Sequence, residues 1–229
     1  MCIKNWLHMY NAYEALFFLN MKYSASKLIK CSAAQLVYFQ KRKEYFESLS
    51  KYEELGIKFQ SKIVKDESLA NVVADEMRGC YSFNGNEIFF CIDMIKNGEF
   101  YEIKSIFDKN GNDTIEYDDW YLENSLIQCA FYKSLLLNME GDVLFTPKFR
   151  IKEGYKKVFL KVNKESPYYL IFGNVGKYNV KVINSLAIID FYKDKINHLT
   201  DYDYAREFDN LWKHKEFGLL SNYFKFEKL

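Results

Sequence analysis

The chain has 229 residues, of which 49% are hydrophobic and 18% aromatic, and this length and composition predict a soluble globular protein with a substantial core. Its 32 Lys and Arg residues and 31 Asp and Glu residues leave a net charge of +1, which excludes a strong overall attraction to nucleic acid or to an acidic membrane. Contact with DNA would therefore need a local patch, and the Lys and Arg residues within 22–43 are candidates, although such a run is also typical of a solvated face.

The five cysteines argue against a disulfide framework, a zinc site and an iron–sulfur cluster, because they are odd in number, far apart and form no Cys-x-x-Cys pair. They are Cys2, Cys31, Cys80, Cys91 and Cys129. With a composition typical of AT-rich coding, this usage predicts the cytoplasm of a bacterial cell or a phage-infected host. The apolar segment 12–20 is too short to cross a bilayer and contains Glu14, so we expect a core element there and no membrane anchor.

The first predicted elements are helices. One opens at Ser24 or Ser26, either of which can cap it, and apolar residues recur at helical spacing from Leu28 to Tyr38. A second helix is predicted over residues 53–65, and a third amphipathic stretch over 69–77 leads into strands at 80–83 and 88–93.

A β-hairpin is the most specific local prediction. Asn97-Gly98 separates two alternating apolar runs, and both residues tolerate the positive φ of a type I′ turn. With these two as the loop, Lys96 pairs with Glu99, and counting outward places Asp93 opposite Glu102.

Side chains alternate along a strand, so Lys104 is predicted to share the face of Glu102. The other face is predicted to be the core face, formed by Phe90, Ile92, Met94, Tyr101 and Ile103. Two carboxylates in opposed positions, roughly 5 Å apart, destabilise a sheet unless a cation or a proton intervenes. Hard oxygen ligands favour Mg²⁺ or Mn²⁺. The hairpin alone is equally consistent with a solvated ribbon that has a charged outer face.

The second half of the chain begins with a strand over 99–107 and a long helix over 120–138. Gln128 and Tyr132 lie one turn apart on that helix, a stripe that taken alone is typical of the solvent side of an amphipathic helix. Further strands are predicted over 143–150, 158–162, 168–172 and 180–191, and a closing helix over 202–219. We expect a single domain, 1–229, in which residues 141–229 pack as an extension on residues 22–140.

Five motifs follow one another in a fixed order along these elements. They are Ser24-x-Ser26-x-Leu28, Gly56-x-x-x-Gln60, Asp93, Glu102-Ile103-Lys104 and Gln128-x-x-x-Tyr132. This combination resembles the PD-(D/E)XK nuclease superfamily, in particular its RecB-type branch, over about residues 23–132. The resemblance implies an α/β fold with a restriction-endonuclease-like core, a central mixed sheet flanked by helices and elaborated by extra carboxyl-terminal strands and a terminal helix.

The resemblance also implies an activity, the Mg²⁺- or Mn²⁺-dependent hydrolysis of DNA, by an exonuclease rather than a sequence-specific endonuclease. Asp93, Glu102 and the Ile103 carbonyl would hold the metal, and Lys104 would steer or activate the attacking water and contact the phosphate. Supporting or DNA-binding roles would belong to Gln128, Tyr132, Ser24, Ser26 and Lys27. The DNA partner can be single- or double-stranded, and a protein partner or a second copy of the chain is compatible with the sequence.

Two positions depart from the family pattern. Gln60 stands where many relatives have a metal-binding His, and its amide oxygen can still ligate a metal; Glu76 is a substitute acid on the stretch that follows. Cys31 lies where some relatives begin an iron–sulfur cluster, but the later cysteine ligands are absent, so no cluster is expected. Gln60 and the near-neutral charge also suit an alternative, a catalytically impaired nuclease-fold subunit that binds nucleic acid or acts as a scaffold. A third interpretation is a protein that binds another protein through an aromatic surface.

Overall fold

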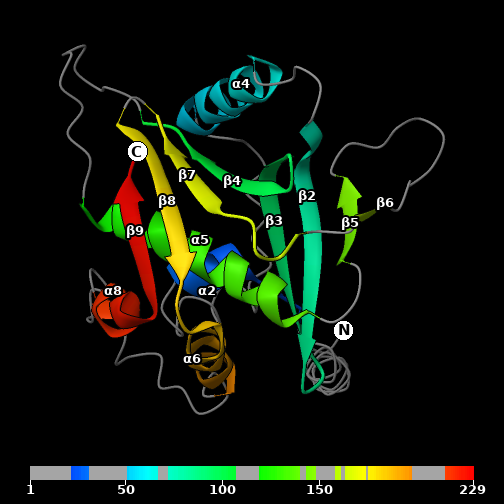
Figure 1. Cartoon of the computed structure of the whole chain (residues 1–229), viewed down its shortest axis with the longest axis vertical. Helices are drawn as coiled ribbons and strands as arrows, with labels where there is room; N and C mark the ends of the chain where they lie inside the picture. The colour runs from blue at the N-terminus through cyan, green and yellow to red at the C-terminus, as the bar shows by residue number, and fades with distance from the viewer. Residues whose placement is uncertain are drawn as a thin grey trace, which may run out of the picture.

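A central mixed β-sheet with helices packed beside it forms the protein, as the computed structural model shows (Figure 1). The structure describes residues 22–30, 51–66, 72–106, 119–139, 143–147, 158–160, 163–173, 175–197 and 215–229. The helices are α2 (Ala25–Lys30), α4 (Lys51–Asp66), α5 (Asp119–Asn138), α6 (Ser185–Asn197), α8 (Lys215–Leu220) and the 3₁₀ helix η2 (Ser221–Tyr223). The strands are β1 (Lys22–Ser24), β2 (Val72–Phe83), β3 (Asn86–Lys96), β4 (Glu99–Lys104), β5 (Val143–Pro147), β6 (Val158–Leu160), β7 (Tyr168–Phe172), β8 (Gly176–Val182) and β9 (Phe224–Lys228).

The strand order β6-β5-β2-β3-β4-β7-β8-β9, with β1 beside β3, combines antiparallel and parallel pairs. Strands β2, β3 and β4 form an antiparallel meander, and β7 then pairs with β4 in parallel. The pairs β7 with β8 and β8 with β9 are antiparallel, as are β2 with β5 and β5 with β6, whereas β1 is parallel to β3. The α/β class with a mixed sheet is thus confirmed, and the strands after residue 141 continue the same sheet on both of its sides.

Asn-Gly dipeptides build both hairpins of the meander. Asn97 and Gly98 have φ angles of 53° and 80°, and Lys96 pairs with Glu99 as predicted. The turn between β2 and β3 uses the same dipeptide, with φ angles of 43° at Asn84 and 77° at Gly85. These positive φ values are those that a type I′ turn requires.

The predicted opposition of Asp93 and Glu102 is wrong in one respect, because the β3–β4 ladder ends one step earlier, at Met94 and Tyr101. One edge of β3 pairs with β2 along its length, so β1 and β4 must share the other edge. β1 pairs with residues 87–89 and β4 with residues 94–96, and Asp93 lies at the fork between them.

Helix α5 lies inside the protein. Every residue from Ser125 to Leu136 is buried, because α5 contacts β7 and β8 and also packs against α2, α6 and α8. The interpretation of Gln128 and Tyr132 as a solvent-facing stripe is therefore wrong, although the helix itself and the 53–65 helix are confirmed. Within the described part of the chain, no helix is both long and apolar enough to cross a bilayer.

Two other predicted elements differ from the structure. The stretch 69–77 was expected to be amphipathic and helical, but β2 begins at Val72, where the long β3 offers a partner and Val72 and Val73 favour extended backbone. The strand predicted over 180–191 ends at Val182. Helix α6 begins at Ser185 because Asn184 Oδ1 accepts a hydrogen bond from the Ala187 amide, 3.0 Å away, and caps it.

The terminal region adds an element that the sequence did not predict, strand β9, which pairs with β8. The predicted closing helix is described only as α8, since residues 202–214 lie outside the described part. Three other predictions also lie outside the described part: the continuation of α2 to Tyr38, Cys31, and the side chains of Lys27 and Glu76.

Lys133 is a buried cation in α5. Its side chain is 6% exposed, and its ammonium donates to the Ser166 carbonyl at 2.7 Å and lies 5.2 Å from the centre of the Phe100 ring. Burial lowers the pKa of Lys133 from 10.5 to about 8, against a smaller opposing effect of Glu165. The folded protein therefore binds this proton less tightly than the unfolded chain does.

This shift predicts a pH dependence of stability. The penalty for burying the charge is complete below pH 8 and is relieved as the pH rises toward 10.5, so wild type should gain up to roughly 3 kcal/mol relative to Lys133→Met over that interval. Urea unfolding of both proteins at several pH values between 7.5 and 10.5 measures the difference. Parallel stability curves would contradict the assignment.

Candidate active site

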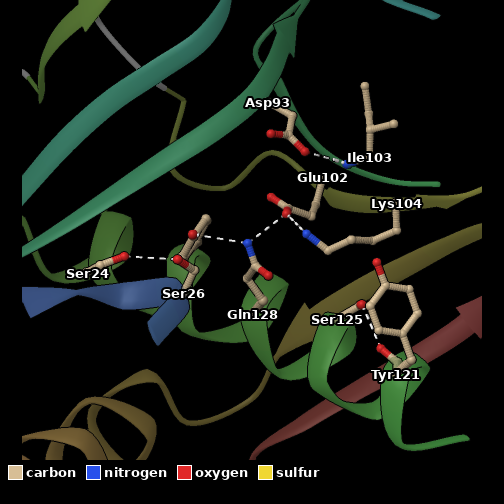
Figure 2. A network of polar contacts seen from close by, with 10 residues as sticks. Ser24, Ser26, Asp93, Glu102, Ile103, Lys104, Tyr121, Ser125 and Gln128 are labelled. Carbon is tan, nitrogen blue, oxygen red and sulfur yellow. Dashed lines mark hydrogen bonds and ion pairs between the residues drawn. The ribbon is translucent and has the colours of Figure 1, made fainter. Parts of the chain in front are cut away.

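Glu102 of β4 is the centre of the polar network in Figure 2. Its side chain is 2% exposed, although it carries a carboxylate. Oε1 accepts hydrogen bonds from two donors, Lys104 Nζ on the same strand and Gln128 Nε2 on α5, the latter at 2.6 Å. Because both donors bind the same oxygen, they fix the orientation of the carboxylate.

The Gln128-x-x-x-Tyr132 motif supports this carboxylate from α5. Gln128 Nε2 also donates to the Tyr132 hydroxyl at 3.1 Å, and the Tyr132 ring packs 5.6 Å from that of Phe90. Both polar side chains are buried, at 4% and 2% exposure. A buried amide between a carboxylate and a phenol predicts a positioning role, since each group restricts the rotamer of the next.

Asp93 joins the site from β3. Its Oδ2 accepts a hydrogen bond from the Ile103 amide at 2.8 Å. The Asp93 side chain thus binds a main-chain N–H of β4 just beyond the last backbone pair of β3 and β4. The amide and carbonyl of one strand residue point to the same edge. The Ile103 carbonyl is therefore directed toward the β3 edge, where Asp93 lies.

The charges of the site determine the protonation of its neighbours. Burial alone would lower the pKa of Lys104, but the carboxylates of Glu102 and Asp93 outweigh it and raise that pKa above its usual range. Burial, together with the charge of Glu102, raises the pKa of Tyr132 and of Tyr168 well above the usual value. Lys104 is thus an ammonium ion and both phenols are neutral near pH 7.

A divalent metal fits this donor set. The carboxylates of Glu102 and Asp93 both lie near the Lys104 ammonium, since the charges of both raise its pKa. With the Ile103 carbonyl they offer hard oxygen donors, and Mg²⁺ is commonly held by one or two carboxylates while it keeps several waters. In the described ranges, no three or more His, Cys, Asp or Glu side chains form a group that could hold a metal, so the main-chain carbonyl and water would have to complete the shell.

Gln60 lies in a pocket next to this centre. The pocket has a volume of about 270 Å³ and is lined by α4, by Ile103 and Lys104 of β4, by Ser105, which follows β4, and by Tyr121 of α5. The structure thus brings Gln60 close to Lys104, as the motif order predicted. Ligation of a metal by its amide stays a prediction.

The serine motif marks the junction of β1 and α2. Ser24 ends β1 beside Phe89, and Ser26 lies in the first turn of α2, with 2.9 Å between the two hydroxyl oxygens. Figure 2 places the pair on the far side of Gln128 from Lys104. Binding of phosphate by these hydroxyls and by Lys27 stays a prediction.

Tyr121 and Ser105 are site residues that sequence reasoning missed. Tyr121, Ser125, Gln128 and Tyr132 follow one another at intervals of four, three and four residues, which places them on one stripe of α5. Ser125 Oγ donates to the Tyr121 carbonyl at 2.7 Å. That spacing was the available signal for Tyr121, whereas nothing in the sequence singled out Ser105.

The buried hydroxyl of Tyr168 predicts that its removal will not destabilise the protein. Its side chain is fully buried and stacks 5.7 Å from Phe100, and its hydroxyl has no hydrogen-bond partner among the described residues. Tyr168→Phe should therefore leave the free energy of unfolding unchanged or raise it by about 1 kcal/mol. The matched variant Tyr132→Phe should lower it, because the Gln128 amide loses an acceptor. Urea unfolding tests both, and a loss above about 1 kcal/mol for Tyr168→Phe would contradict the description.

Comparison of the chain with protein-family models, curated proteins and solved structures gave no match. The geometry of the site and the motifs that build it are therefore what indicate a function.

Proposed function

We propose that this chain is a divalent-metal-dependent DNA nuclease with a restriction-endonuclease-like core of the RecB type. One observation carries the proposal. Residues from separate motifs on β3, β4 and α5 surround the buried Glu102 carboxylate, and Gln60 of α4 lies beside them. Removing a carboxylate from water is costly, and the burial of Glu102 where these motifs meet supports a role in chemistry.

Asp93, Glu102 and the Ile103 carbonyl would hold Mg²⁺ or Mn²⁺. Such an ion lowers the pKa of a bound water and neutralises the charge that develops on the phosphate. Gln128 and Tyr132 are positioning residues, because they act on the DNA only through the Glu102 carboxylate.

Lys104 would act as a fixed positive charge. Its ammonium is held in place by the hydrogen bond to the Glu102 carboxylate. It would stabilise the phosphate and orient the attacking water. Ser24, Ser26 and Lys27 would bind backbone phosphate further along the DNA strand.

A time course with linear duplex, circular duplex and single-stranded DNA, each with Mg²⁺ or Mn²⁺, tests this function. We expect metal-dependent loss of linear but not circular duplex, the behaviour of an exonuclease. Mn²⁺ should also raise the melting temperature of wild type and do so much less for Asp93→Asn, because a ligand stabilises the state that binds it. No cleavage of any substrate, together with equal melting curves, would contradict the proposal. Metal binding without cleavage would favour the impaired, binding-only alternative.

A further inference from the structure

The pocket beside Lys104 differs from the neighbouring acidic site in the residues that line it. Its walls are formed mainly by Ile57, Phe59 and Gln60 of α4, Lys104 of β4, Ser105 just after β4, and Tyr121 of α5. None of the described residues that line it is acidic, since Asp93 and Glu102 lie outside it. Lys104 thus binds the Glu102 carboxylate through its ammonium and also lines a pocket of aromatic, amide and hydroxyl groups. The pocket suits an uncharged aromatic group attached to an anion.

The size of the pocket limits what can enter it. Its volume of about 270 Å³ is just below the range of about 300 to 1,000 Å³ for pockets that enclose drug-sized molecules. A group about the size of one nucleoside suits that volume. A base inside a duplex is stacked and paired, so a nucleotide would enter the pocket from a single strand or a frayed end.

The α4 wall stands close to the strand that bears the catalytic motif. A Cβ atom on Gly56 would lie 3.0 Å from Ser105 Oγ, a distance tighter than ordinary contact, so glycine allows α4 to approach β4. Phe59 and Gln60 follow within one turn, which directs them to the same side of the helix. On the opposite wall, the Tyr121 hydroxyl points toward the Lys104 side chain (Figure 2).

We propose that this pocket binds one unpaired nucleoside of the DNA strand, with its base against Phe59 and Tyr121 and its phosphate at Lys104. This inference depends on the proposed nuclease function and deepens it, because it makes an unpaired strand or a frayed end the substrate. Stacking on aromatic side chains accepts every base, so the pocket would bind without sequence preference.

Fluorescence quenching of 2-aminopurine tests the pocket without any cleavage. Single-stranded oligodeoxynucleotides carry the probe at the 5′ end, in the middle or at the 3′ end, and are titrated with the full chain in EDTA or with Ca²⁺. We expect quenching in at least one position for wild type. Phe59→Ala and Tyr121→Ala should raise Kd about fivefold or more, the effect of losing one base–aromatic stack, while Tyr121→Phe should bind like wild type.

A charge-matched pair of surface variants keeps the test valid if the aromatic variants fail to fold. Ile57 is 45% exposed at the pocket and Ser61 is exposed on the same helix but outside the pocket lining. Ile57→Asp should weaken oligonucleotide binding by repelling the phosphate, and Ser61→Asp should weaken it much less. Absent quenching, or equal effects of the two Asp variants, would overturn the proposal. Cleavage assays run in parallel distinguish the proposed nuclease function from the proposed nucleoside pocket. DNA cleavage without Phe59-dependent quenching would support the nuclease function and contradict only the pocket.

Discussion

Glu102→Gln protein is expected to cleave DNA at least about 100-fold more slowly than wild type, because it loses the one carboxylate on which the site converges. Glutamine keeps the length and shape of the side chain, and its carbonyl oxygen can still accept from Lys104 and Gln128. What it lacks is the negative charge that would hold the metal and balance the Lys104 ammonium. The fold should therefore survive while the chemistry fails.

The chain offers a matched control on the same strand. Glu99 also carries a carboxylate that accepts a hydrogen bond, from the Tyr101 hydroxyl at 2.6 Å, but it pairs with Lys96 at the turn, away from the site. Glu99→Gln should cleave at nearly the wild-type rate. Initial rates on end-labelled linear DNA, with circular dichroism spectra and melting curves for both variants, measure the contrast. Equal rates for Glu102→Gln and wild type would remove Glu102 from the mechanism.

The hairpin of this site was predictable because its signal is local. Asn97-Gly98 specifies the turn, and the turn specifies the register up to Met94 and Tyr101. The fork at Asp93 was not predictable, since it depends on β1, a three-residue strand that pairs with β3 from more than sixty positions away. Such a short strand shows no alternation pattern, so the sequence indicated a continuous ladder with Asp93 opposite Glu102.

The burial of the site depends on the same kind of distant contact. A polar stripe on a helix is ambiguous, because Gln128 and Tyr132 would look the same in sequence on a solvent face or against a buried carboxylate. Only the packing of α5 between the sheet and the helices α2, α6 and α8 decides between these environments. The motif order indicated which residues would meet, whereas their burial followed from the parts of the chain outside the motifs.

A buried ion pair between α6 and α8 should have the largest effect on stability. Lys195 of α6 and Glu216 of α8 are 6% and 5% exposed, with 2.5 Å between Nζ and Oε1. Lys195 also donates to the Leu28 carbonyl of α2 at 2.5 Å, and the Tyr192 hydroxyl donates to Glu216 at 3.2 Å. Lys195→Met leaves the Glu216 carboxylate buried without its cation, a change that costs about 3 to 5 kcal/mol.

The double variant Lys195→Met/Glu216→Leu distinguishes two effects on the free energy of unfolding. One is the cost of leaving a single charge buried without its partner, and the other is the cost of removing both charges. With both charges removed, no buried charge is left uncompensated, so the double variant should be more stable than Lys195→Met alone. Urea unfolding of wild type, both single variants and the double variant gives the coupling energy directly. Additive losses below about 1 kcal/mol each would show that the pair contributes little.

The same variants connect stability to the proposed chemistry. Leu28 belongs to α2, the short helix that carries Ser26 and follows Ser24, so the Lys195 bond ties the carboxyl-terminal helices to the serine motif. If these serines bind phosphate, the folded Lys195→Met/Glu216→Leu protein should bind DNA more weakly at unchanged metal affinity, because Asp93 and Glu102 lie on other elements. Unchanged DNA binding would instead confine the ion pair to a structural role and leave the serine motif as a helix start.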